Sequence, residues 1–313
     1  MTVEDVIVRM GWGTASDLDV APLGGGITNL NFRVRATGGS YVVRIPGKDS
    51  MRLGIDRERE HACTIAAAVS GVSPEVVAFF EDAGVLVTRF VDGRALTTEE
   101  IARPETLRRV ARTIRRYHGG PVFPGTFSPF RAVGEYLAFA IPRGAPVPER
   151  FDWMLQQARR LEAALGNPPV LRPCHNDLLL ANWLDDGQHL WLLDWEYAAM
   201  GDIFFDLGNF AVHHQLSDEA EQTMLAAYFA SRLPVPDYVL ARLKLMKIIS
   251  DLREAMWAMV QVTISDLDYD FMAYGKKHFD RYVFQLMAPR LETWLEQVAV
   301  DKPPRALWED NPA

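Results

Sequence analysis

The order of strand-like and helix-like segments constrains the fold of this chain more than any other feature. Residues 30–36 alternate between apolar and polar, residues 37–40 (Thr-Gly-Gly-Ser) form a turn signature, and residues 41–45 continue as a strand. This pattern is typical of a β-hairpin. A second hairpin is predicted over residues 76–91, with its turn at 81–84. The first part of the chain is therefore predicted to be rich in strands.

Helical spacing is found between the two hairpins and again after them. Apolar residues between positions 56 and 69 are spaced as on a helix, and Gly71 follows as a stop signal. After the second hairpin the pattern is helical. We therefore predict an α+β protein with a small β-rich lobe over residues 1–91 and a larger helical lobe over residues 92–313. Small ligands favour the cleft at such a junction.

The first helix predicted in the larger lobe, near residues 107–117, combines an apolar face with a run of arginines. These are Arg108, Arg109, Arg112, Arg115 and Arg116. Such a run can bind nucleic acid, but the formal net charge of -8 gives the protein as a whole no electrostatic reason to bind DNA or an anionic membrane. We therefore interpret the arginines as a solvated helix face and predict no nucleic-acid or membrane partner.

Cysteine content and hydropathy indicate a cytoplasmic location. The chain has two cysteines, Cys63 and Cys174, far apart in sequence, which argues against a disulfide framework and fits a reducing compartment. The first residues lack the basic and apolar regions of a signal peptide. No uncharged apolar stretch reaches the roughly 18 residues that a membrane span needs.

Three polar side chains in the middle of the chain carry the strongest functional signal. Asp177 and Asn182 lie in the segment 174–183, and Asp194 ends the apolar run 190–193, as a carboxylate at the end of a buried strand would. Hard cations such as Mg²⁺ prefer carboxylate and amide oxygens. Phosphoryl transfer needs such a metal and a base that orients the attacking hydroxyl. The pattern favours this chemistry over acids that only cap helices or fill turns.

A zinc site and a serine hydrolase are the alternatives to weigh. His175, His213, His214 and Cys174 are potential zinc ligands. The two adjacent histidines do not have helical i, i+4 spacing, and neither H-E-x-x-H nor paired C-x-x-C occurs. We therefore expect hydrogen-bonded or core histidines. The G-x-S-x-G motif of serine hydrolases is also missing.

The small lobe holds two candidate nucleotide-binding features. The glycine run 24–26, followed by Thr28 and Asn29, allows backbone amides to approach a phosphate, although by itself such a run is by default an ordinary flexible turn. Arg44 lies in the middle of an apolar strand and therefore needs a partner or a ligand. Glu60, on the following helix, is the candidate partner.

Nearly the whole chain resembles the choline/ethanolamine kinase family, within the aminoglycoside-phosphotransferase-like group that shares the two-lobed protein-kinase fold. The segment GGITNLNFRV resembles the phosphate-binding hairpin of the family, and the resemblance assigns Thr28 and Asn29 to nucleotide binding. YVVRIPGKDS and IDREREH resemble the nucleotide-binding strand and helix, in which Arg44 replaces the strand lysine of protein kinases and pairs with Glu60.

The inter-lobe hinge and the catalytic segments also resemble the family. VTRFVDGRAL resembles the hinge, whose backbone at Thr88, Arg89 and Phe90 would contact adenine. HNDLLLAN resembles the catalytic loop, which implies Asp177 as the base and Asn182 as a metal ligand. LLDWEYAAMGDIFFDLGNF resembles the metal-binding segment, which implies that Asp194 binds Mg²⁺. Its D-W-E-Y and F-D-L-G-N elements narrow the match to the choline/ethanolamine branch.

Residues 256–282 resemble the part of the family that surrounds the substrate ammonium. A quaternary ammonium donates no hydrogen bond, so aromatic faces and acids hold it. The resemblance implies an aromatic wall of Trp257 and Tyr274, although Trp257 among apolar neighbours would also suit a plain helix core. Tyr197 is expected nearby because it follows the metal-binding segment.

Three acidic or titratable positions bear on the choice of substrate. Glu196, in the D-W-E-Y element, is a further expected substrate residue. Glu254 replaces a second tryptophan of eukaryotic members, and His213 replaces an acid after the G-N element. The Glu254 carboxylate suits a cation, a primary amine or a hydroxyl-rich substrate.

The resemblance implies an enzyme that uses ATP and Mg²⁺ to phosphorylate the hydroxyl of a small amino alcohol, with choline favoured. Ethanolamine, an aminoglycoside, thiamine or another amino alcohol are the alternative substrates. A non-catalytic, nucleotide-binding relative is the third hypothesis, which the intact Asp177, Asn182 and Asp194 oppose. The use of GTP and the oligomeric state are left open.

Overall fold

The N-terminal lobe is built on one antiparallel sheet. The computed structural model describes residues 1–24, 29–47, 54–231 and 234–300. The strands are β1 (Asp19–Leu23), β2 (Asn29–Ala36), β3 (Gly39–Pro46), β4 (Val76–Phe80) and β5 (Val85–Arg89), in the spatial order β1-β2-β3-β5-β4. Both predicted hairpins, β2-β3 and β4-β5, are confirmed.

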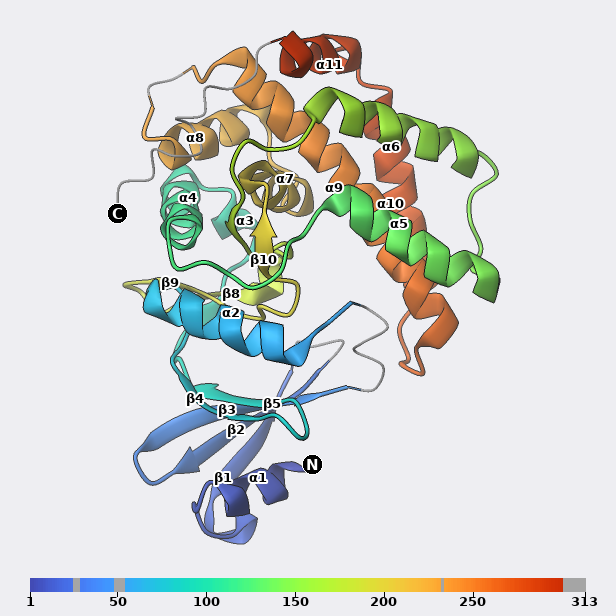
Figure 1. Cartoon of the computed structure of the whole chain (residues 1–313). Coiled ribbons are helices and arrows are strands. Elements are labelled where there is room, and N and C mark those ends of the chain that lie inside the picture. The colour runs from blue at the N-terminus through green and yellow to red at the C-terminus, as the bar shows by residue number, and fades with distance from the viewer. Residues whose placement is uncertain (25–28, 48–53, 232–233, 301–313) are drawn as a thin grey trace.

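Two helices belong to this lobe. The apolar residues Val6 and Ile7 of α1 (Val3–Arg9) are fully buried with Val34 and Val43 of the sheet. Helix α2 (Arg57–Val69) lies between the sheet and the helical lobe (Figure 1). The helix α2 was predicted from its apolar spacing.

The apolar spacing of α2 does not mark its buried face, however. Ile65 and Val69 are 43% and 72% exposed, whereas Cys63 and Ala67 are fully buried. Small side chains on the inner face allow close packing, and the Cys63 thiol donates to the Ala198 carbonyl oxygen of the helical lobe at 3.5 Å.

The helical lobe is organised around one long buried helix, α9. Its helices are α3 (Thr98–Ile101), α4 (Pro104–His118), α5 (Pro129–Ala140), α6 (Phe151–Leu165), α7 (Ile203–His213), α8 (Asp218–Tyr228), α9 (Asp237–Ile264), α10 (Phe271–Leu286) and α11 (Leu291–Val300). Helices α5, α7 and α10 pack directly against α9, which is buried over most of its length (Figure 1). Such burial on all sides explains why α9 has apolar residues around its whole circumference.

Two small sheets hold the segments that carry the candidate catalytic residues. Strand β7 (Arg172–Cys174) pairs with β10 (Ala199–Gly201), and β8 (Trp183–Asp185) pairs with both β6 (Arg94–Ala95) and β9 (Leu190–Leu192). The loop between β7 and β8 carries Asp177 and Asn182, and the loop between β9 and β10 carries Asp194. Because β8 and β9 are hydrogen-bonded neighbours, these two loops leave the same small sheet side by side.

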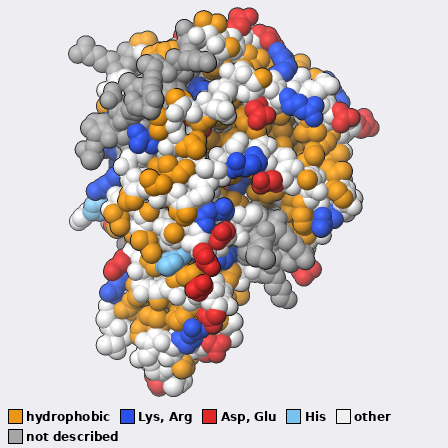
Figure 2. All heavy atoms as spheres, viewed as in Figure 1, with side chains coloured by type: hydrophobic (Ala, Val, Ile, Leu, Met, Phe, Trp, Pro, Cys, Tyr) orange, Lys and Arg blue, Asp and Glu red, His pale blue; other side chains and the backbone are white. Residues whose placement is uncertain are grey.

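The predicted α+β architecture, a small antiparallel lobe followed by a helical lobe, is confirmed; the boundary between residues 91 and 92 stays a prediction. Acidic, basic and apolar side chains are interspersed on the face that Figure 2 shows. In the described ranges, no helix combines the length and the apolar character that crossing a membrane requires. Both cysteines are buried free thiols.

Candidate active site

The loop that carries Asp177 is held in place by one buried carboxylate, Asp206 of α7. Asp206 accepts the backbone amides of His175 and Asn176 at 2.8 and 2.7 Å, and the Tyr117 hydroxyl at 2.6 Å. Burial raises the pKa of Asp206, but the hydrogen bond with His118 at 3.0 Å, the His118 charge and the Tyr117 hydroxyl lower it below its usual value. Asp206 lies within the F-D-L-G-N element, but the sequence analysis assigned no role to it, because its partners are distant in sequence.

The backbone is strained at two positions of the site. Asn176 and Asp194 have φ angles of 68° and 65°, in the left-handed region that side chains other than glycine rarely adopt. Strained residues of this kind cluster at functional sites, where the surrounding structure enforces them. The side-chain amide of Asn176 is fixed by a 2.9 Å hydrogen bond to the Tyr197 carbonyl oxygen.

Asn182 and Asp194 lie on neighbouring backbones and suit a hard cation. The Leu193 amide donates to the Asn182 carbonyl oxygen at 2.9 Å, which aligns the two loops. The Asn182 side-chain NH₂ donates to the Asp177 carbonyl oxygen at 2.9 Å, so its own oxygen remains available as a ligand. The Asp194 side chain is 29% exposed. An amide oxygen and a carboxylate are the donor set that Mg²⁺ prefers.

An ion-pair network connects the two lobes at this site. Arg44 forms the expected ion pair with Glu60 and also contacts the Asp194 carboxylate at 2.5 Å. The Arg44 side chain is only 12% exposed, so the network lies inside the cleft. Arg44 therefore links the N-terminal lobe to one of the candidate metal ligands.

A second arginine, Arg57, extends this network and was not predicted. It pairs with Glu60 at 2.6 Å and with Glu196 at 3.3 Å, and it donates to the Asn29 side-chain oxygen at 2.9 Å. Asn29 in turn donates to Glu196 at 3.0 Å. Burial and the neighbouring Asp194 raise the pKa of Glu196, which the two arginines oppose. Asn29, predicted for the nucleotide, and Glu196, predicted for the substrate, are thus direct neighbours at the inter-lobe network.

The predicted hinge residues continue the sheet. Thr88 pairs with β3 and β4, the Arg89 amide donates to the Glu75 carbonyl oxygen at 2.9 Å, and the Phe90 amide donates to the Ser40 carbonyl oxygen at 3.0 Å. These two backbone amides are therefore already hydrogen-bonded within the lobe, and the contact of this segment with adenine stays a prediction. Thr28 lies outside the described residues.

The predicted aromatic wall forms one cluster. The Trp257 indole NH donates to the Tyr197 hydroxyl at 2.9 Å, and the ring centroids of Trp257 and Tyr274 are 5.8 Å apart. The Tyr274 hydroxyl donates to the Glu254 carboxylate at 3.1 Å. Trp257 is 8% exposed, so it also packs in the helical core, as the alternative interpretation required.

Arg253 joins this cluster to the candidate base and was missed by the sequence analysis. It is 1% exposed, forms an ion pair with Glu254, and lies 3.6 Å from Asp177. Its guanidinium group lies 4.6 Å from the centre of the Tyr197 ring. Burial raises the pKa of Asp177, and the positive charge of Arg253 opposes that rise. The sequence signal that could have revealed Arg253 is the pair of adjacent charges, Arg253 and Glu254, within an apolar helix.

Two of the four potential zinc ligands, His175 and His214, are hydrogen-bonded, as predicted. His175 contacts the Leu193 carbonyl oxygen at 2.9 Å, and His214 contacts the Leu178 carbonyl oxygen at 3.1 Å. Both histidines therefore support the loop that bears Asp177. Burial lowers the pKa of each imidazole, which keeps both neutral.

Comparison with known proteins identifies the family. Residues 19–243 match the model of the phosphotransferase enzyme family. The Haemophilus influenzae protein LicA is 29% identical over 65% of this chain and 61% of its own length. A probable ethanolamine kinase A from Dictyostelium discoideum is 28% identical over 85% of each chain. A solved choline/ethanolamine kinase family protein from Mesorhizobium loti is 29% identical, with a TM-score of 0.82 over 96% of this chain and all of the other.

The match covers the sheet of the N-terminal lobe, the two loops that bear Asp177 and Asp194, and the start of α9. It therefore includes the residues of the inter-lobe network. The likeness to the solved relative extends this agreement to the rest of the helical lobe. The chain belongs to the phosphotransferase enzyme family, as a choline/ethanolamine kinase-like member with the two-lobed kinase fold.

Proposed function

We propose that this protein uses ATP and Mg²⁺ to phosphorylate the hydroxyl of a small amino alcohol, and that choline is the preferred acceptor. The observation that carries this proposal is the adjacency of the candidate base to the aromatic cluster. Asp177 lies 3.6 Å from Arg253, whose partner Glu254 accepts the Tyr274 hydroxyl, and Tyr274 packs against Trp257. The intact catalytic residues oppose the alternative of a non-catalytic relative. The buried free thiols support a cytoplasmic location.

The proposed mechanism assigns a separate task to each group. Asp177 accepts the proton of the acceptor hydroxyl, a role that its raised pKa favours. Asn182 and Asp194 would hold Mg²⁺, which neutralises phosphate charge when bound. Arg44, kept in the cleft by Glu60, orients the nucleotide phosphates.

Choline is favoured because Trp257 and Tyr274 offer aromatic surfaces beside a carboxylate, which is how a quaternary ammonium is held. Ethanolamine is the second candidate. The Glu254 carboxylate supports it, because a primary ammonium can donate hydrogen bonds to that acceptor. One Glu254 oxygen already pairs with Arg253 and the other accepts from Tyr274, so a primary amine would have to share these acceptors.

The function is tested by measuring ATP consumption with Mg²⁺ against choline, ethanolamine, thiamine and an aminoglycoside. We expect the highest kcat/KM for choline. Higher efficiency with ethanolamine would retain the kinase assignment and reject choline as the preferred acceptor. Consumption that none of these acceptors stimulates would reject the proposed acceptor class.

Arg44→Ala is expected to raise the KM for ATP much more than the KM for the amino alcohol, because Arg44 would contact the phosphates. Steady-state kinetics with each substrate varied in turn measures the difference. Arg35→Ala is the matched control, since Arg35 lies in the same sheet but pairs with Asp19 on the exposed surface at 3.2 Å. Equal changes in the two KM values would argue against a phosphate role for Arg44.

Trp257→Ala is expected to raise the choline KM about tenfold and to leave the ATP KM nearly unchanged, because cation–π contacts contribute roughly 0.5–2 kcal/mol. Trp294→Ala on α11 controls for the loss of a partly buried tryptophan, since Trp294 lies beside Lys244, nearer the start of α9 than Trp257. If the choline KM changes equally in both variants, Trp257 has a purely structural role.

A further inference from the structure

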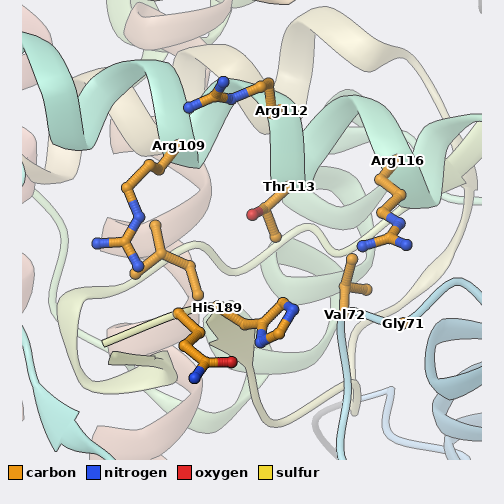
Figure 3. Close-up of a pocket in the computed structure, with 9 residues that line it drawn as sticks. Gly71, Val72, Arg109, Arg112, Thr113, Arg116 and His189 are labelled. Carbon is orange, nitrogen blue, oxygen red and sulfur yellow. The ribbon is translucent and has the colours of Figure 1, made fainter. Parts of the chain in front are cut away.

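A basic cavity of about 200 Å³ lies outside the site described above. It opens between α4, the segment that links α2 to β4, and the turn that links β8 to β9. The lining residues are Gly71, Val72, Arg109, Arg112, Thr113, Arg116, Gln188, His189 and Leu190. Figure 3 shows Arg109 and Arg116 extending from α4 toward the side where His189 lies, whereas the Arg112 side chain lies along the helix.

Among the residues that the structure describes, two of the three arginines in this cavity lack a countercharge. Arg109 is neutralised by Asp185, with nitrogen–oxygen distances of 2.7 and 2.8 Å. Within the described ranges, Arg112 and Arg116 form no ion pair, and Arg112 donates only to the Arg108 carbonyl oxygen. Like charges four residues apart destabilise a helix. An anion bound in this cavity would therefore offset the repulsion, although the protein as a whole is acidic.

We propose that this cavity binds the phosphate group of a small anionic molecule. Guanidinium groups suit phosphate because their planar donors make paired, charge-assisted hydrogen bonds. The Thr113 hydroxyl and the Gln188 amide add neutral donors on two sides. Enclosure by three elements suits a small molecule better than the extended backbone of a nucleic acid. The sequence alone suggested that the arginine run is a solvated helix face; under this proposal, part of it binds a ligand.

The bound phosphate also bridges elements that lead to the active site. The Arg116 guanidinium packs against Gly71. Its Cζ atom lies 3.4 Å from the position that a Cβ atom would occupy on this glycine. Next to Gly71, the Val72 carbonyl oxygen accepts the Leu192 amide of β9 at 2.8 Å. Strand β9 ends two residues before Asp194. A phosphate held by α4 and His189 therefore stiffens the connection between α2 and β9.

Calorimetric titration of the full chain with pyrophosphate tests the site. We expect the double variant Arg112→Gln/Arg116→Gln to weaken one pyrophosphate site by about tenfold or more. The matched control Arg108→Gln removes an exposed arginine of the same helix that does not line the cavity, and should change affinity by less than about twofold. Pyrophosphate bound at the nucleotide site persists in all three proteins. A double variant that binds as tightly as the wild type overturns the proposal.

Two further measurements separate the parts of the proposal. Hydrogen exchange of the Leu192 amide should slow in saturating pyrophosphate in the wild type but not in the double variant. Binding without slower exchange overturns the bridging role. The second measurement is competition with a short RNA oligomer. If the RNA displaces pyrophosphate at a concentration below the dissociation constant of pyrophosphate, the cavity binds nucleic acid and the small-molecule class is overturned.

Discussion

Asp177→Asn is expected to lower kcat by a factor of about 10² or more, with little change in nucleotide affinity. General-base catalysis contributes roughly 10²–10⁴-fold, and the amide cannot accept the hydroxyl proton. A 10²-fold loss corresponds to about 2.7 kcal/mol of transition-state stabilisation. The measurement is kcat from steady-state kinetics together with a nucleotide dissociation constant.

The fold should survive this substitution, because the nearest charged partner of Asp177, Arg253, keeps its ion pair with Glu254. A thermal melt of the variant verifies this point. Asp237→Asn, at the exposed start of α9, serves as the matched control for removing one carboxylate. A folded Asp177→Asn protein that turns over within tenfold of the wild type would rule out Asp177 as the base.

Asp194→Ala is expected to reduce activity by on the order of 10² or more at ordinary Mg²⁺ concentrations. The substitution removes the charged member of the proposed metal site and leaves phosphate repulsion uncompensated. Raised Mg²⁺ should restore only part of the activity, because Asn182 alone offers a neutral ligand. The measurement is initial rate as a function of Mg²⁺ at saturating ATP and acceptor.

The same substitution also breaks the contact between Asp194 and Arg44, so that effect needs its own control. Arg44→Gln removes the ion pair and retains the carboxylate. It should raise the KM for ATP without shifting the Mg²⁺ dependence as far as Asp194→Ala does. An unaltered Mg²⁺ dependence in Asp194→Ala would assign the metal to other residues.

The hairpins and the polar residues of the two catalytic loops could be predicted because their signals are local. Alternation along residues 30–36 determines a strand whose partner is the next segment of the chain. The spacing between Asp177 and Asn182 is likewise a property of a single loop, which Leu179 and Asn182 close through backbone hydrogen bonds of 2.9 and 3.1 Å. Local sequence also predicted the helix α2.

For helix α2, the sequence pattern predicted the helix but not its buried face. Its apolar stripe at Ile65 and Val69 predicted a helix correctly, but these residues are exposed, and the inner face carries Cys63, Ala67 and the buried Glu60. The helix lies between two lobes. Its orientation therefore depends on small side chains and a charged pair on the inner face, and not on its large apolar residues. A periodic pattern alone does not contain this information.

The two hairpins, the spacing of Asp177 and Asn182 and the family resemblance follow from the sequence, because they depend on residues close together in the chain. Which distant groups meet depends on how the folded chain packs. Arg44 contacts Asp194 across 150 positions of sequence, and Arg57 contacts Glu196 across 139. Arg253 reaches Asp177 only because α9 packs beneath the catalytic loop. The free energy of such buried charges depends on their partners and on exclusion of water, which folding alone establishes.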